Sequence, residues 1–406
     1  MKNLETLIQE LCPDGVEFVK LGDVCEIKGR IGFRGYTRKD LVSESEGAIT
    51  LSPSNIINGN IVYDKCSYIS WAKYEESPEI MAEVGDVVFT KTASVGKTAY
   101  IENMPKEMTI NPQLVLLKKF RGISKYLAYI LKTTYFQNEV KKITGVGSVP
   151  NVPQSSLAKI EIPLPPIEVQ TEIVRILDKF TSLEAEIEAE LDCRKRQYEY
   201  YRDKLLSFDN VGGQEVEWKK MSEVSFYPKT RIDASELSDN SYIGVENLLK
   251  DKLGRTDSTV KPEGSVIQFV EKDILIGNIR PYLRKIWKSD CKGGTNGDVL
   301  CIRVKEPSEV SPDYLFHILS SEKFFLYDIK NSKGAKMPRG DKAAVMDFEI
   351  PVPTLEEQNR IVSILNRFES LTTSLQSGLP AEIAARRKQY EHYRDKLLTF
   401  KRKGAA

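Results

Sequence analysis

The sequence has few of the residues that build metal sites and disulfide frameworks. It contains only two histidines and six cysteines among 406 residues, and no two cysteines form a C-x-x-C pair. Zinc sites need clustered histidine and cysteine ligands, and disulfide-rich domains need paired cysteines in a short chain. We therefore expect no metal ion in this chain, and we expect its scattered thiols to be reduced.

Long apolar runs are also missing. No segment approaches the roughly 20 apolar residues that cross a bilayer, and Met1–Glu5 lacks the apolar stretch of a signal peptide. We expect a cytoplasmic protein without membrane contact. The formal net charge is +1, from 59 basic and 58 acidic residues. Any basic surface must therefore be local.

No catalytic motif is complete. Gly96-Lys97-Thr98 resembles the end of a phosphate-binding loop, but Lys91 occupies the position of its earlier glycine. Pro165-Pro166 is followed by Ile167, which excludes the motif of amino-methyltransferases. His317 and His392 lie in helical patterns and are assigned to packing or to the solvated surface. We therefore predict no catalytic residue, and a binding function.

The chain instead contains a long internal repeat. Ile162–Pro165 matches Ile350–Pro353, and each begins a long helical pattern. Matched positions such as Gln170 and Gln358 lie 188 residues apart. The other matches include Ile173/Ile361, Phe180/Phe368, Leu183/Leu371, Tyr198/Tyr390, Tyr201/Tyr393 and Arg202/Arg394. A repeat of this length indicates two half-molecules in tandem.

The repeat extends into the segments before the helices. The matched blocks are Val16–Lys20 with Val216–Lys220, Gly85–Phe89 with Lys272–Ile276, Gln113–Leu117 with Asp298–Ile302, and Tyr126–Leu131 with Tyr314–Leu319. Runs rich in β-formers are bounded by Gly, Asn and Pro, and one helix is predicted near each module's end, around residues 124–142 and 312–330. These patterns predict an α+β module.

We predict four ranges along the chain. A globular domain at 1–162 is followed by a long helix at 163–210, and a second domain at 211–350 by a second long helix at 351–406. The fold class is therefore α+β, with two globular domains in tandem, separated by two long helices and related by a pseudo-two-fold repeat.

The long helices carry apolar residues at coiled-coil spacing. Ile173, Phe180 and Ile187 recur at intervals of seven, as do Ile176 and Leu183. The first helix leads into the second module, so we predict that the two helices pair as an antiparallel coiled coil. The alternative is that each helix packs on its own module.

The second helix contains four additional residues. The offset between the copies is 188 at Gln170/Gln358 and 192 at Gln197/Gln389. A coiled coil absorbs an insertion of four by slight local unwinding. We therefore expect this helix to continue through the insertion.

Two loops in each module carry side chains suited to nucleic acids. Arginine and asparagine read guanine and adenine edges, and lysine contacts phosphate. The first loop supplies Lys91, Thr92 and Lys97 in one module and Asn278, Arg280, Tyr282 and Arg284 in the other; the second supplies Ser148 and Asn151, and Lys333, Lys336 and Arg339. The alternative is a solvated basic loop, but the same placement in both modules favours binding. We expect Lys401-Arg402-Lys403 to be a solvated tail.

Several segments, together with the tandem arrangement of the two halves, resemble the DNA-specificity (S) subunit of type I restriction–modification enzymes. They are Ile162–Gln170, Asp273–Pro281 and Tyr201–Leu206, and the resemblance covers nearly the whole chain. One departure is that Lys91-Thr92-Ala93 stands where the second module has Asn278-Ile279-Arg280. Base contacts therefore cannot be carried from one half to the other.

The resemblance implies two target-recognition domains that each read one half of a split sequence in double-stranded DNA, through the major groove. It also implies that the helical pair spaces the domains and docks two DNA-methyltransferase subunits, which two restriction/translocase subunits join. S-adenosylmethionine, ATP and Mg²⁺ would belong to those partners, and none to this chain. The docking residues would be Gln170, Phe180, Tyr198, Tyr201, Arg202, Gln358, Phe368, Tyr390, Tyr393 and Arg394.

Two other interpretations remain. The chain could be a coiled-coil scaffold whose modules bind protein partners, and sequence-restricted methylation by added methyltransferase would distinguish the two hypotheses. A self-sufficient methyltransferase or nuclease would need motifs that the chain lacks.

Overall fold

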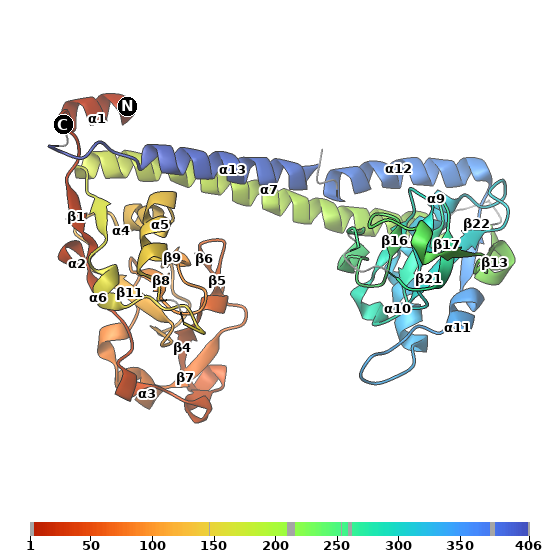
Figure 1. Cartoon of the computed structure of the whole chain (residues 1–406), viewed down its shortest axis with the longest axis horizontal. Coiled ribbons are helices and arrows are strands. Elements are labelled where there is room, and N and C mark those ends of the chain that lie inside the picture. Colours follow the sequence, from red (N-terminus) through yellow and green to blue (C-terminus); the bar gives the residue numbers. More distant parts are fainter. Residues whose placement is uncertain are drawn as a thin grey trace. The chain divides into compact units, whose positions relative to one another are not determined.

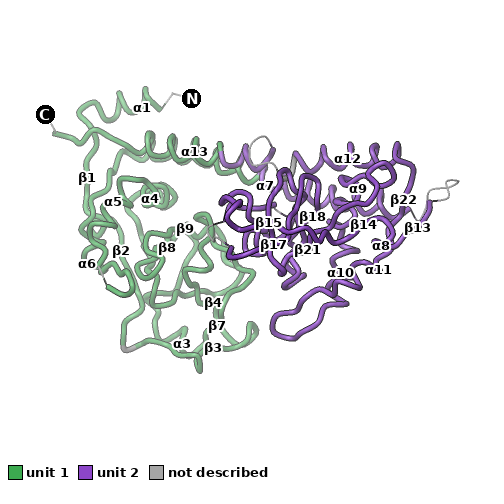
Figure 2. Tube along the Cα trace, turned by 45° about the vertical axis from the view of Figure 1, so that its right-hand side comes forward, with its two compact units in different colours: residues 1–185, 385–406 green, residues 186–384 purple. Residues whose placement is uncertain are grey.

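The computed structural model describes residues 4–145, 147–208, 216–252, 254–258, 262–373 and 378–404, without the side chains of residues 33 and 371–373. The chain divides into two compact units (Figure 2). Unit 1 comprises residues 1–185 and 385–406, and unit 2 comprises residues 186–384. The domain boundaries drawn from the repeat stay a prediction.

Unit 1 contains two four-stranded sheets. Its strands are β1 (Phe18–Lys20), β2 (Glu26–Lys28), β3 (Leu41–Val42), β4 (Gly47–Leu51), β5 (Ile56–Ile57), β6 (Asn60–Ile61), β7 (Ser67–Ser70), β8 (Val87–Thr90), β9 (Thr98–Tyr100), β10 (Met108–Ile110), β11 (Leu114–Lys118) and β12 (Glu161–Pro163). One sheet has the antiparallel order β2-β11-β8-β9. The other has the order β10-β4-β7-β3, in which β10 and β4 run parallel. The short pairs β1-β12 and β5-β6 are antiparallel.

The antiparallel sheet of unit 1 lies between helices and the second sheet. The helices are α1 (Leu4–Leu11), α2 (Leu21–Val24), α3 (Trp71–Glu75), α4 (Ser124–Leu131), α5 (Thr134–Ile143), α6 (Gln154–Leu157), the first part of α7 (Ile167–Ser207) and most of α13 (Leu379–Leu397). Val87 and Phe89 of β8 pack in the core with α4, α5 and α7. Val88 between them packs with β4 and β10. Successive side chains of a strand face opposite sides, so one strand serves both cores.

Unit 2 repeats this arrangement. Its strands are β13 (Glu217–Lys220), β14 (Ser225–Phe226), β15 (Arg231–Asp233), β16 (Tyr242–Ile243), β17 (Ser265–Phe269), β18 (Ile274–Gly277), β19 (Ile286–Lys288), β20 (Gly293–Thr295), β21 (Val299–Val304) and β22 (Glu349–Val352). The sheet β14-β21-β18-β19 corresponds to β2-β11-β8-β9, and the pair β13-β22 to β1-β12. Ile274 and Ile276 face the helical core, and Leu275 faces the other. The second sheet differs, with the order β15-β17-β20-β16.

The helix predicted near the end of each module is two helices. They are α4 and α5 in unit 1, and α9 (Pro312–Leu319) and α10 (Glu322–Asn331) in unit 2, which also contains α8 (Met221–Val224), α11 (Lys342–Asp347) and α12 (Leu355–Thr373). Thr133 and Ser321 interrupt the pattern because their side chains accept the N–H groups of Phe136 and Phe324, each at 3.2 Å. A hydroxyl in this position caps a new helix.

The second long helical segment also differs from the expectation of one helix. The first is continuous over the 41 residues of α7, whereas the second forms α12 and α13. Gly378 accepts the N–H groups of Ala381 and Glu382, and Pro380 lies in the first turn of α13. Proline suits a first turn and disrupts a helix interior, which explains a new start here. The four additional residues fall in an interval that includes residues 374–377, which lie outside the described residues.

Antiparallel pairing of the helices is confirmed within each unit (Figure 1). In unit 1 the rings of Phe180 and Tyr393 stack with centroids 5.6 Å apart, and Glu184 pairs with Arg387. In unit 2 the rings of Tyr201 and Phe368 stack at the same distance of 5.6 Å. The two stacks join the same pair of repeat positions, with the roles of the halves exchanged.

The alternative, packing of each helix on its own module, is also partly realised. Ile173 and Leu177 are buried in the core of unit 1, and Ile361 and Leu365 in that of unit 2. Leu183, expected in the seam, is 47% exposed. The start of each helical segment therefore packs on its module, and later turns pair with the other helix.

The C-terminal basic segment is not a solvated tail. Lys401 and Lys403 form backbone hydrogen bonds with Val16 at 2.8 and 2.9 Å. Arg402 pairs with Glu161 at 2.5 Å, and its guanidinium lies 4.6 Å from the centre of the Phe18 ring. The expectation was wrong because the partners of these residues lie far away in the sequence. Both ends of the chain thus belong to unit 1 (Figure 1).

Candidate nucleic-acid interface

The two candidate loops of unit 2 are joined by backbone hydrogen bonds. The turn after β18 lies against the loop between α10 and α11, where Ile279 and Arg339 form an antiparallel bridge. The N–H of Arg280 donates to the carbonyl of Pro338 at 2.7 Å. The carbonyl of Asn278, in the same turn, accepts the N–H of Gly340 at 2.9 Å. The two loops therefore form a single surface.

Unit 1 has the same pair of loops. Thr92 and Asn151 form the bridge, and the N–H of Ala93 donates to the carbonyl of Pro150 at 2.9 Å. The carbonyl of Lys91, in the same turn, accepts the N–H of Val152 at 2.8 Å. Each bond has its counterpart in unit 2, so the loop pair is a shared framework that carries different side chains.

The turn residue at the centre of each pair has a left-handed backbone. Its φ is 65° at Ala93 and 54° at Arg280. For a residue other than glycine this conformation costs ~1–2 kcal/mol. The bonds to Pro150 and Pro338 hold the chain there. Strain maintained at equivalent positions indicates a functional constraint.

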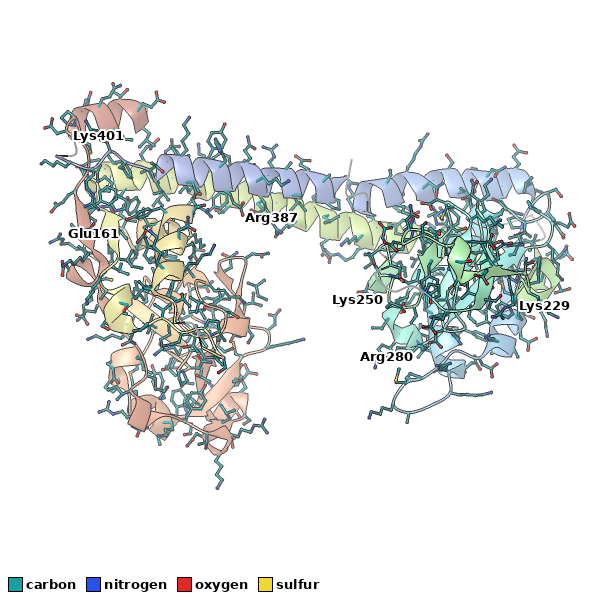
Figure 3. The ribbon with its side chains drawn as sticks, viewed as in Figure 1. Glu161, Lys229, Lys250, Arg280, Arg387 and Lys401 are labelled. Carbon is teal, nitrogen blue, oxygen red and sulfur yellow. The ribbon has the colours of Figure 1, made fainter. Side chains whose placement is uncertain are left out.

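The cations predicted in unit 2 divide into paired and unpaired groups. Arg284 pairs with Glu322, Lys333 with Asp341 at 2.5 Å, and Arg339 with Asp298 at 3.0 Å. The side chains of Arg280 and Lys336 are exposed and have no hydrogen-bonding or ionic partner within the described part of the chain. Arg280 lies at the edge of unit 2 (Figure 3), and Tyr282 is 47% exposed. Arg280 and Lys336 are thus the cations most available to a ligand.

Unit 1 presents fewer cations at its loop pair. The hydroxyl of Thr92 donates to Oδ1 of Asn151 at 2.8 Å, which orients that amide. Ser148 is exposed, and partial burial lowers the pKa of Lys91. The loop pair of unit 1 therefore presents a more neutral surface than the loop pair of unit 2.

Lys97 has a structural role that its position in a basic loop did not indicate. Its Nζ donates to the carbonyls of Pro53 and Ile56 at 3.1 and 3.3 Å. Lys285, the equivalent residue of unit 2, donates to the carbonyl of Val245 at 2.6 Å. Both lysines tie an edge hairpin to a neighbouring segment of their unit. The predicted phosphate contact of Lys97 stays a prediction.

A buried polar pair lies beneath the loops of unit 2. Oδ1 of Asn278 and Oδ1 of Asp328 are buried and have no hydrogen-bond partner among the described residues. A Cβ on Gly340 would lie 2.8 and 2.6 Å from these two atoms, so only glycine fits there. Burial raises the pKa of Asp328 to about 6.

We expect Asp328→Asn to stabilise the protein above pH 6. The folded-state pKa of Asp328 lies above its ordinary value of 3.8, so the folded state binds the proton more tightly. Stability is lost as the pH rises from about 4 to about 6, by roughly 3 kcal/mol. Urea denaturation at pH 8 should show the gain, and at pH 4 it should vanish. An equal gain at both pH values would exclude titration of Asp328 as its cause.

Asp341→Asn is the matched control, with the opposite sign. Lys333 and the N–H groups of Ala343 and Ala344 lower the pKa of Asp341. A lowered pKa contributes stability that is present above the unfolded value and is lost as the pH falls. This variant should therefore lose stability at pH 8.

Gln170 and Gln358, assigned to partner docking, lie inside their units. Oε1 of Gln170 accepts the N–H of Ile123 at 2.9 Å, and its Nε2 donates to the carbonyl of Pro165 at 2.8 Å. The side chain of Gln358 makes three hydrogen bonds of 2.9 Å each. Its Oε1 accepts the N–H of Ser311, and its Nε2 donates to the carbonyls of Glu309 and Pro353. Both side chains are buried and fix the start of a helix against its module. They offer no surface to another chain in this conformation.

The other predicted docking residues form equivalent pairs. The guanidinium of Arg202 lies 5.5 Å from the centre of the Tyr198 ring, and that of Arg394 lies 5.7 Å from that of Tyr390. Arg202 and Arg394 are buried. Tyr201 and Tyr393 remain 42% and 37% exposed beside Phe368 and Phe180. Of these residues, the two tyrosines present the most surface.

His317 is a packing residue. It is buried, its Nε2 lies 2.8 Å from Oδ1 of Asn366, and burial lowers its pKa to about 4. Among the described residues no cluster of three His, Cys, Asp or Glu could hold a metal ion. Nor is any described helix long and apolar enough to cross a membrane.

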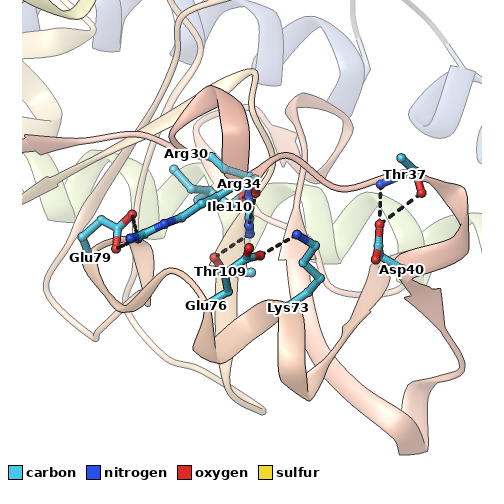
Figure 4. Close-up of polar contacts among 9 residues, drawn as sticks. All are labelled: Arg30, Arg34, Thr37, Asp40, Lys73, Glu76, Glu79, Thr109 and Ile110. Carbon is cyan, nitrogen blue, oxygen red and sulfur yellow. Dashed lines mark hydrogen bonds and ion pairs between the residues drawn. The ribbon is translucent and has the colours of Figure 1, made fainter.

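Sequence reasoning missed a polar cluster in unit 1 (Figure 4). The buried guanidinium of Arg30 donates to the carbonyls of Ile110 and Arg34, each at 3.3 Å, and lies 5.2 Å from the centre of the Tyr36 ring. Arg34 pairs with Glu79 at 3.3 Å. These contacts hold the segment after β2 against β10. The cluster is satisfied internally, and we assign it to stability.

The loop pair occurs in a chain whose two halves match one known family. The sequence model of that family, described as the type I restriction modification DNA specificity domain, matches residues 13–192 and 215–385. The specificity subunit of the type I restriction enzyme EcoR124I/EcoR124II from Escherichia coli is 34% identical over 268 residues. This match covers 60% of the chain and 64% of the relative.

Two further likenesses agree with this match. A putative type I restriction enzyme specificity subunit of Haemophilus influenzae is 31% identical over 61% of the chain and 66% of the relative. The matches thus span about two thirds of the length of these two relatives. A chain solved in work on complex assembly of the type I R-M system has a TM-score of 0.57 at 17% identity, over 95% of this chain and 97% of that one, which concerns the fold. Since the family's sequence model matches most of both halves, the chain belongs to the type I restriction modification DNA specificity family.

Proposed function

We propose that this chain is the non-catalytic, sequence-specific DNA-recognition subunit of a type I restriction–modification complex. Each unit would read one half of a bipartite target. The observation that carries the proposal is the loop pair, which has the same backbone bonds in both units but different side chains. A shared framework with different exposed groups suits two related surfaces that recognise different sequences.

The exposed groups have the chemistry of base and phosphate recognition. Arg280 carries an unpaired guanidinium, which can donate to both guanine acceptors in the major groove. Lys336 is a cation on the adjacent loop and suits a phosphate. Asn151 presents an amide oriented by Thr92, and asparagine pairs with adenine.

We propose that the helices space the units and dock two methyltransferase subunits, which two restriction/translocase subunits join. At ~1.5 Å per residue, the 41-residue α7 is roughly 60 Å long. Half-sites one DNA turn apart are separated by ~34 Å. Tyr200 and Tyr201 of α7 are 60% and 42% exposed and their ring centroids lie 5.4 Å apart, and an exposed aromatic pair of this kind supports a protein partner. S-adenosylmethionine, ATP and Mg²⁺ would be held by the partners.

The decisive experiment combines this chain with the methyltransferase subunit and maps adenine methylation. We expect methylation confined to one bipartite sequence, whereas methyltransferase without this chain should lack that restriction. Methylation without sequence preference, in a complex that still assembles, would contradict the proposal. It would favour the alternative of a protein-binding scaffold.

Lys336→Ala is expected to weaken binding to all sequences alike. A lysine that contacts one phosphate releases about one counterion, so the slope of log K against log salt should fall by about 1. The slope is measured by titrating the assembled complex with labelled DNA at several salt concentrations.

Lys333→Ala is the matched control, because its ammonium is paired with Asp341 at 2.5 Å. We expect a smaller change in slope for this variant. An unchanged slope in Lys336→Ala would remove Lys336 from the phosphate contacts.

A further inference from the structure

Each loop pair carries one exposed apolar side chain at the same position. Val149 in unit 1 and Met337 in unit 2 are 52% and 50% exposed. They are equivalent in the repeat, because each precedes the proline whose carbonyl accepts from Ala93 or Arg280. Single exposed apolar residues are common on protein surfaces. Two at equivalent places in a candidate binding surface need an explanation.

Backbone hydrogen bonds hold the chain on either side of both residues. In unit 2 the loop of residues 334–338 is closed by two backbone bonds of 2.9 Å between Lys333 and Arg339 (the loop after α10 in Figure 1). In unit 1 Gly145 donates to Asn151 at 2.9 Å and closes the corresponding loop. A residue before proline is restricted to extended conformations. The backbone at these two positions therefore has little conformational entropy to lose when the side chains meet a ligand.

The neighbours of these side chains determine what kind of ligand fits. Met337 lies between Lys336 and the proline that precedes Arg339, and Val149 follows Ser148. A lone apolar group within polar and basic loops is too small for a protein-binding patch. The major groove presents one apolar feature to such a surface, the C5-methyl group of thymine.

We propose that Val149 and Met337 each contact the C5-methyl group of a thymine in the half-site read by their unit, an inference that rests on the proposed function. In unit 1 the contact is reinforced by Ala93, which occupies the place of Arg280 and presents only a methyl group. Asn151, oriented by Thr92, lies on the same loop pair and suits adenine. Unit 1 thus reads A·T pairs at the position where unit 2 presents an arginine.

The test removes one methyl group from the DNA at a time. The complex with methyltransferase subunits is titrated with its mapped target, in which single thymines are replaced by deoxyuridine. A buried methyl group contributes about 0.8 kcal/mol, so deoxyuridine at the contacted thymine should weaken binding by ~4-fold. Val149→Ala should reduce this sensitivity in one half-site only, because the methyl group of Ala93 remains, and Met337→Ala should abolish it in the other only.

The results separate this inference from the proposed function. If binding remains specific but deoxyuridine is tolerated at every thymine, or if its effect is undiminished in both variants, the inference is overturned and the function stands. A half-site without thymine overturns it for the unit concerned. A complex without sequence preference overturns both. Because the two side chains are exposed, each variant should melt at the wild-type temperature, and this measurement serves as the folding control.

Discussion

Arg280→Ala is expected to weaken binding to the cognate target by ~1–3 kcal/mol, or about 5- to 150-fold, and to relax specificity at one position of one half-site. The side chain is exposed and free of intramolecular partners in the described chain, while its backbone is held by the bond to Pro338. A guanidinium fixed at its base and free at its tip can pair with guanine through two bonds. Its removal should therefore change both affinity and base preference.

The measurement is a titration of the assembled complex against targets with each base pair of the half-sites changed in turn. Arg280→Lys is the informative companion, because lysine keeps the charge but cannot form two parallel bonds. It should restore affinity in part and specificity hardly at all. Arg284→Ala is the control for loss of a nearby arginine, since its guanidinium is paired with Glu322. Unchanged affinity and half-site preference in Arg280→Ala would show that Arg280 reads no base.

Gln358→Leu is expected to destabilise unit 2 by ~2–5 kcal/mol, because it leaves one buried and two partly buried backbone groups without a partner, and a buried one costs ~1–3 kcal/mol. The buried amide accepts a hydrogen bond from the N–H of Ser311 and donates to the carbonyls of Glu309 and Pro353. Leucine fills similar space but replaces none of these bonds. Gln170→Leu should cost unit 1 less, since its amide makes two such bonds.

The tryptophans allow each unit to be followed separately. Trp71 lies in unit 1, and Trp218 and Trp287 lie in unit 2, so that fluorescence in a Trp71→Phe background reports on unit 2. Glu356→Leu is the control, because this exposed residue of α12 should change stability by less than ~0.5 kcal/mol. If the denaturation midpoint of Gln358→Leu equals that of Glu356→Leu, the bonds of Gln358 contribute nothing to unit 2.

The parts of the fold that sequence predicted are those encoded by local pattern. The blocks Gly85–Phe89 and Gln113–Leu117, matched across the repeat, contain most of β8 and most of β11, which pair with each other. Their counterparts contain most of β18 and most of β21, which also pair. Continuous apolar runs and repeated order were sufficient, because these strands are buried on both faces.

The parts that were missed depend on single residues within a pattern. Thr133 and Ser321 divide helices that the apolar spacing continues across, and Pro380 begins a helix where an uninterrupted one was expected. Each was readable in principle, because capping hydroxyls and prolines are known helix-start signals. The prediction followed the spacing of the apolar residues, which continues across these helix-start signals.

The candidate site was predicted by residue type but not by partner. Arg284, Lys333 and Arg339 share the chemistry of Arg280, yet each is paired with a carboxylate elsewhere in the chain. The spacing of residues along a sequence does not reveal such pairs, since Arg284 and Glu322 meet only through the packing of α10. The apolar Val149 and Met337 were not predicted, because base and phosphate contacts were expected from polar side chains.

Unit 1 is built from two segments that are far apart in the sequence, and this has a consequence for biosynthesis. Leu398 belongs to the same core as the first module, and residues 186–384 must be translated before it exists. At ~5–20 residues per second, the ribosome needs roughly 10–40 s for that interval. The nascent first module lacks a core neighbour throughout, whereas unit 2 emerges as one uninterrupted segment. The order of completion is therefore inverted, and the half of the protein that is begun first is finished last.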